Sequence, residues 1–163
     1  MTPDYSFDIY VAASAKQHAL TLLQRLCTPG SANVLEAAKK NEDDATFALT
    51  LSFTTDHALA GWREENPAMH IGVPIDEVHV GEVTAWIKHA TDLPGIQEEK
   101  FDIVCITLWP VTRSMQIACL ESPNVRNALI RLLKDGGGVA GYIDRGDGSL
   151  AEFWPQNAAP YGL

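Results

Sequence analysis

The chain has 163 residues, of which 46% are hydrophobic and 20% are charged, so it has the composition of one globular domain and not of a disordered protein. Asp and Glu total 21 against 12 Lys and Arg, which gives a net charge of −9 at pH 7. Such a surface repels phosphate backbones and anionic lipid, so we expect no binding to nucleic acid or to a membrane surface. We see no secretory signal and no apolar run of the roughly 20 residues that a membrane helix needs.

The first third of the chain predicts two strands and one or two helices. Residues 6–12 and 45–54 alternate apolar and polar side chains, as half-buried strands do. Between them, a helix is expected to start at Ser14, with Gln17 completing a capping box, and to end at Thr28-Pro29-Gly30. Residues 33–40 fit either a short helix or the start of a hairpin.

The middle of the chain gives weaker patterns. Residues 56–67 fit neither period and are expected to be irregular, whereas residues 69–75 alternate like an edge strand. Val80, Val83, Ile87 and Ala90 keep helical spacing, so a helix is predicted over residues 77–91.

The last third predicts the centre of the sheet and its closing hairpin. Residues 101–109 are apolar on both faces, which is typical of a central strand, and residues 115–120 are expected to pair with them. Ser122 and Pro123 start a helix that three glycines at 136–138 end. Residues 139–144 and 150–154 then form a hairpin.

Hairpins interrupt the alternation of strand and helix that a doubly wound parallel sheet requires. We therefore predict an α+β fold, with an antiparallel or mixed β-sheet and about three helices packed mainly on one face. The chain is expected to form a single domain over residues 1–163, with a loose tail at 156–163.

Three cysteines indicate the compartment. Cys27, Cys105 and Cys119 are odd in number and widely spaced, which argues against a disulfide framework and favours a reducing, cytoplasmic environment. Cys105 and Cys119 lie in apolar segments, where a free cysteine packs as a small hydrophobic residue.

The motifs give little support to catalysis, a metal or a cofactor. The triple glycine follows a helix, where carbonyl groups point outward, so it is interpreted as a C-cap and not as a phosphate loop. Asp144 and Asp147 supply too few oxygen ligands for a calcium loop. No histidine pair has the spacing of a helical zinc site. We therefore expect no catalytic residue, no metal site and no cofactor.

Exposed acids supply the most specific hypothesis. They fall in loops or at element ends, where they serve either solubility or the docking of a basic protein. Trp62 lies beside two of them, and is either a plug at the edge of the core or an interface anchor. The candidate partner-binding residues are Glu42, Asp43, Asp44, Trp62, Glu64, Glu65, Asp76 and Glu77.

In general character the chain resembles the immunity proteins of bacterial toxin systems, which are small, acidic α+β domains without a catalytic motif. The resemblance implies a non-catalytic cytoplasmic protein that neutralises a basic toxin or nuclease. One alternative is a small enzyme with a dispersed site built on His70, His79 and an acid. Another is a subunit or small-ligand module, in which residues 101–109 support a homodimer interface or an apolar pocket.

Overall fold

The computed structural model describes residues 4–31, 34–40, 44–96 and 99–155. Within these residues, one antiparallel sheet has the strand order β2-β3-β4-β1-β5-β6. Its strands are β1 (Ser6–Ala12), β2 (Ala45–Thr54), β3 (Glu77–Ala90), β4 (Ile103–Pro110), β5 (Gly138–Asp144) and β6 (Leu150–Trp154). The helices are α1 (Lys16–Leu26), α2 (Val34–Lys40), α3 (His57–Glu65), α4 (Arg113–Glu121) and α5 (Pro123–Asp135), with 3-10 turns η1 (Ala13–Ala15) and η2 (Pro67–His70).

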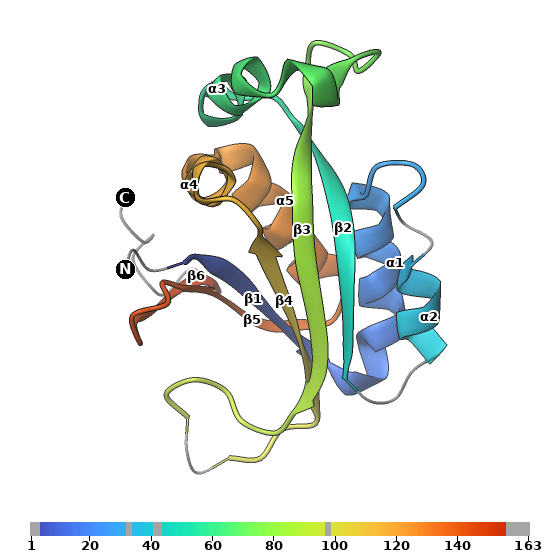
Figure 1. The fold of residues 1–163 in the computed structure, drawn as a ribbon. Coiled ribbons are helices and arrows are strands. Elements are labelled where there is room, and N and C mark those ends of the chain that lie inside the picture. The colour runs from blue at the N-terminus through green and yellow to red at the C-terminus, as the bar shows by residue number, and fades with distance from the viewer. Residues whose placement is uncertain (1–3, 32–33, 41–43, 97–98, 156–163) are drawn as a thin grey trace.

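The predicted α+β class is confirmed, although the described part of the chain holds five α-helices and not about three. One face of the sheet packs against these helices and forms the main core, in which Ile9, Ile106 and Ile143 of the strands meet Leu23 and Leu129 of the helices. Figure 1 shows α3 at one end of the sheet, whereas the connection between β3 and β4 lies at the opposite end. None of the described helices is long and apolar enough to cross a membrane.

The predicted strands β1, β2 and β4 and the predicted ends of α5 are confirmed. β1 and β2 have the predicted bounds, and β4 lies between β3 and β1 in the sheet, as expected for a strand that is apolar on both faces. The Ser122 hydroxyl accepts a hydrogen bond from the Val125 amide at the start of α5. Gly137 has a φ of +74° just after that helix, so the triple glycine is a C-cap.

The helix predicted over residues 77–91 is wrong, because these residues form β3. In the pairing with β2, Thr50 lies opposite Glu82 and Leu51 opposite Val80, so Gly81 is an extra residue on β3. This bulge shifts the inward-facing positions by one residue. The inward side chains Val80, Val83 and Ile87 are therefore three and four residues apart, which is also the spacing of one face of a helix.

Four other local predictions are also wrong. Residues 56–67, expected to be irregular, contain α3, whose first turn Asp56 caps by accepting a hydrogen bond from Leu59. Residues 69–75, expected to be a strand, run from η2 into turns, and residues 115–120 belong to α4. The α1 capping box at Ser14 is absent, because η1 leads directly into the helix.

Candidate functional site

The structure divides the predicted acidic residues between the two ends of the sheet. Asp44 lies exposed just before β2, at the end of the sheet where Ala45 pairs with Ile87. The four acids at positions 64, 65, 76 and 77 lie at or beyond the other end, where Thr54 pairs with Glu77. The ten-residue strand β2 separates the two sets by about 30 Å, at about 3.3 Å per residue. Glu42 and Asp43 lie outside the described residues.

At the end of the sheet near α3, exposed acids surround exposed apolar side chains. Ile71 and Ile75 are 83% and 87% exposed, and Met69 beside them is also exposed. We call this surface the α3–β3 tip, and it comprises Glu64, Glu65, Met69, Ile71, Ile75, Asp76 and Glu77, all of them exposed. The sequence identified its acids, but it assigned the apolar residues to a strand, so this surface was not predicted.

Arg63 holds the tip in one conformation. Its guanidinium donates hydrogen bonds to the backbone carbonyls of Val73 and Pro74, at 3.0 Å each, and to that of Glu77. The tip also pairs with the end of β2, where the Thr55 amide donates to the Asp76 carbonyl at 2.7 Å. Ile71 and Ile75 therefore project from an ordered segment.

Trp62 is 7% exposed and belongs to the main core, so the core-plug alternative describes its position. Its indole lies near Gly81, Met69 and Met115, beneath the tip. The alternative in which Trp62 anchors a partner is therefore corrected, because an indole that is 7% exposed offers no surface to another protein. Trp62 is buried because it lies on the inward side of α3. The sequence pattern does not predict this helix, so it does not show which way Trp62 faces.

His70 is a buried polar group at the base of the tip. It is 6% exposed, and neither ring nitrogen has a hydrogen-bond partner. It lines a cavity of about 430 Å³ together with Arg63, Glu64 and Ile75. Burial lowers the pKa of His70, and the positive charge of Arg63 adds to this effect. The lowered pKa favours the neutral imidazole, whose two ring nitrogens are buried and unpaired at the base of the tip.

The two histidines of the enzyme hypothesis lie near each other, with ring centroids 6.3 Å apart. Among the described residues, no three His, Cys, Asp or Glu side chains are grouped so that they could hold a metal ion. Cys105 and Cys119 are buried, and burial raises the pKa of the Cys119 thiol to about 12, with a smaller contribution from Asp56. Such a thiol carries little nucleophilic thiolate near neutral pH.

The face of the sheet opposite the helices carries a groove that was not predicted from the sequence. The groove has a volume of about 700 Å³ and crosses β5, β1, β4 and β3. We call it the open-face groove, and its lining includes Asp4, Ser6, Asp8, Tyr10, Trp86, Lys88, Cys105, Thr107, Trp109, Asp144 and Asp147. Recognition of β3 as a strand would have placed Trp86 and Lys88 on this face, because they alternate with the buried Ala85 and Ile87.

Asp8 is the half-buried carboxylate of the open-face groove. Its Oδ1 accepts a hydrogen bond from the Thr107 hydroxyl at 2.9 Å. Burial raises the pKa of Asp8, and the neighbouring charge of Asp144 acts in the same direction, whereas the Thr107 hydrogen bond and Lys88 lower it. The Thr107 hydrogen bond and Lys88 therefore do not fully offset the cost of burying the Asp8 charge.

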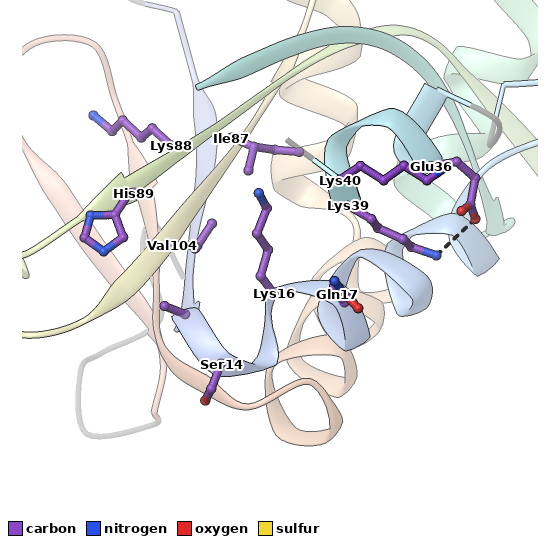
Figure 2. Close-up of a pocket in the computed structure, with 11 residues that line it drawn as sticks. Ser14, Lys16, Gln17, Glu36, Lys39, Lys40, Ile87, Lys88, His89 and Val104 are labelled. Carbon is purple, nitrogen blue, oxygen red and sulfur yellow. Dashed lines mark hydrogen bonds and ion pairs between the residues drawn. The ribbon is translucent and has the colours of Figure 1, made fainter. Parts of the chain in front are cut away.

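A third cavity, of about 740 Å³, lies between α1, α2 and the ends of β3 and β4. Figure 2 shows Lys16, Lys39 and Lys40 around it, with Lys88 pointing away. Lys39 is already paired with Glu36 at 3.1 Å and donates to Gln24 at 2.7 Å. Because Glu36 lies in the same lining, this cavity is a weaker candidate for ligand binding than the tip or the open-face groove.

Comparison with known protein families, with curated proteins and with solved structures found no match to this chain.

Proposed function

We propose that the protein is a non-catalytic cytoplasmic binding protein that uses the α3–β3 tip to dock onto a basic partner protein. The finer proposal is that of an immunity protein, which neutralises a basic bacterial toxin or nuclease by covering its active surface.

The observation that carries this proposal is the exposure of Ile71 and Ile75 on an ordered segment. Two neighbouring isoleucines that are more than four-fifths exposed cost free energy in water, and a partner that covers them recovers it. Because Arg63 holds the segment through three backbone carbonyls, little conformational entropy remains to be lost on binding. The tip therefore has the properties of a preformed apolar anchor.

Charge complementarity supports a basic partner. Glu64, Glu65, Asp76 and Glu77 are all exposed on a chain whose net charge is −9. Glu64 lines the same cavity as Ile75, and Asp76 and Glu77 directly follow Ile75 in the chain. An apolar centre within a charged rim is the usual anatomy of a protein interface, and the rim steers a partner of opposite charge. The cavity at the base of the tip, which Arg63 and Glu64 line, would accept a polar side chain of that partner.

The test first identifies the partner and then measures its binding. The full-length protein serves as bait in a lysate of its native cell, and the captured protein is identified, purified and measured in a binary binding assay. We expect a basic protein whose toxic or enzymatic activity the bait inhibits. The double variant Ile71→Asp/Ile75→Asp should lose affinity by at least about a hundredfold, since it places charges at the buried centre.

Charge reversal separates the rim from the centre. Glu64→Lys/Glu65→Lys should slow association several-fold at low salt, and the effect should shrink as the ionic strength rises through about 0.15 M. Asp44→Lys, at the other end of the sheet, shows whether the second acidic cluster also contributes. Leu150→Asp is the matched control, because Leu150 is an exposed apolar residue on β6 away from the tip.

Wild-type binding by both tip variants, at low salt and with folded protein, would remove the tip from the interface. A partner that is acidic, or that keeps its full activity in the complex, would contradict the neutralising role.

A further inference from the structure

The open-face groove combines exposed aromatic rings with carboxylates in a way that the α3–β3 tip does not. Trp86 and Trp109 are 42% and 46% exposed, which is unusual for the largest apolar side chain. Asp4, Asp8, Asp144 and Asp147 line the same groove, and Lys88 is the one cationic side chain in its described lining. The groove is thus aromatic and strongly anionic.

The strand register places these groups within reach of one ligand. Thr107 of β4 pairs with Trp86 on one side and with Asp8 on the other. Since neighbouring strands lie about 4.8 Å apart, the backbones at Trp86 and Asp8 are about 10 Å apart, with the short Thr107 side chain between them. Trp109 lies diagonal to Trp86 on the same face, at a distance of about 7 Å. The two indoles and the carboxylate therefore occupy adjacent positions on one face of the sheet.

The protein already uses one of these rings to hold a cation. The Lys88 ammonium lies over Trp86, 4.6 Å from the centroid of the ring. This cation–π contact shows that the indole face is oriented toward a positive charge. Asp144 and Asp147 use carboxylate oxygens to hold the turn at Gly146 and Ser149, whereas Asp8 faces the centre of the groove with Thr107 as its hydrogen-bond donor.

We propose that the open-face groove binds an alkyl guanidinium group, stacked against the indoles of Trp86 and Trp109 and paired with the Asp8 carboxylate. A guanidinium is planar, so it stacks on an indole while its edge donates two hydrogen bonds to a carboxylate. The groove, at about 700 Å³, accommodates the group with its alkyl chain. An anion would meet the carboxylates, and an uncharged apolar ligand would desolvate Asp8 without pairing it.

The probe is argininamide, which carries the guanidinium without a carboxylate. Calorimetry and tryptophan fluorescence should show one site, with a dissociation constant on the order of 1 mM for a ligand of this size. Citrulline amide is the matched control ligand, because it has almost the same shape and an uncharged urea in place of the guanidinium. It should bind at least about tenfold more weakly, since it lacks both the ion pair and the cation–π contact.

Three variants test the assigned contacts. Trp86→Ala and Asp8→Asn should each weaken argininamide binding about tenfold, by removal of the stacking surface or of the paired charge. Lys88→Met should strengthen it several-fold, because it frees the face of Trp86 and removes a like charge. An increase in affinity in Lys88→Met distinguishes a cationic ligand from an anionic one, because the same variant would weaken the binding of an anion.

A guanidinium reaches the groove either as a free metabolite or as an arginine side chain of a peptide. Argininamide and the peptide Gly-Arg-Gly-amide share the group, and the tighter ligand of the two identifies the source. Binding of either one supports the guanidinium chemistry.

The tip variant Ile71→Asp should keep argininamide binding while it loses the protein partner, so failure of one proposal is distinguishable from failure of the other. Absence of argininamide binding at about ten times the expected dissociation constant would overturn the guanidinium proposal. Equal binding of citrulline amide, or weaker binding by folded Lys88→Met, would also overturn it.

Discussion

The α3–β3 tip and the open-face groove both place large apolar side chains beside carboxylates, but they are built by different means. Trp86 and Trp109 stand on neighbouring strands, so the backbone ladder of the sheet sets their positions. Ile71 and Ile75 lie between η2 and β3, where tertiary hydrogen bonds from Arg63 hold the chain. The groove is therefore rigid by secondary structure, whereas the order of the tip depends on a few contacts beneath it.

This difference has consequences for the effects of mutation. Substitution of the exposed indoles of the groove should change ligand binding with little cost in folding, because the backbone ladder survives it. Substitutions beneath the tip should cost stability and change the shape of the surface above. The following predictions test this contrast, from the largest expected effect to the smallest.

Trp62→Ala should lower the free energy of unfolding by about 3–5 kcal/mol, as truncation of a buried aromatic residue does. Trp86→Ala, in the groove, should change it by less than about 0.5 kcal/mol, because that indole is substantially exposed. Urea unfolding monitored by circular dichroism measures both values. Similar losses for the two variants would show that the groove and the tip do not differ in the way proposed.

Asp56→Ala should destabilise the protein by about 2–3 kcal/mol, through the loss of a cap and of partly buried hydrogen bonds. The Asp56 carboxylate accepts from the Leu59 amide of α3 and, at 2.6 and 3.0 Å, from the Ser122 hydroxyl and the Asn124 amide at the start of α5. It thereby connects the tip to the body. Asp76→Ala, at an exposed acid of the tip, is the control and should lie within about 0.5 kcal/mol of wild type in the same unfolding assay.

Arg63→Ala should cost about 1–2 kcal/mol and loosen the tip selectively. Amide hydrogen exchange should accelerate at Thr55, Val73 and Glu77, whose amides donate to carbonyls within or beside the tip. The amides of β1 and β4 should exchange as in wild type. Unchanged exchange at the tip would mean that Arg63 does not hold it.

Asp8→Asn should raise the melting temperature at pH 7, and the gain should disappear near about pH 3. Burial raises the pKa of Asp8 above 3.8, so the folded state binds the proton more tightly than the unfolded state. The protein therefore loses stability as the pH rises from 3.8 through the folded-state pKa, and the uncharged Asn avoids this loss. Asp144 raises and Lys88 lowers the pKa of Asp8, and the Asp8 charge in turn raises the pKa values of Tyr10 and Cys105.

Asp147 also lines the open-face groove, but its pKa is shifted in the opposite direction, so Asp147→Asn should have the opposite effect. Hydrogen bonds from Ser149 lower the pKa of Asp147, so its charged form stabilises the fold above 3.8 and this contribution is lost as the pH falls. Its substitution should therefore lower the melting temperature at pH 7 and have little effect near about pH 3. Parallel thermal scans of the two variants should give shifts of opposite sign at pH 7, and shifts of the same sign would contradict the assigned directions.

Much of the fold could be predicted from local patterns. β1 and β2 alternate without interruption, and Ser122-Pro123 and the glycines at 136–138 mark both ends of α5 through contacts close in sequence. These features depend on residues within a few positions of one another, which is the range over which sequence periodicity and capping act. The α+β class follows from them.

The candidate sites depended on interactions that no local pattern contains. Gly81 is a bulge only because β2 pairs with β3, and without that pairing Trp86 and Lys88 were assigned to a helix and the groove was missed. The tip exists because Arg63 reaches carbonyls 10 to 14 residues away, which keeps Ile71 and Ile75 out of any strand. The sequence by itself determined the acidic surface, the α+β class and strands such as β1 and β2, through composition and short-range periodicity. Only tertiary structure decided which acids, isoleucines and tryptophans share a surface, because long-range register and side-chain hydrogen bonds set those distances.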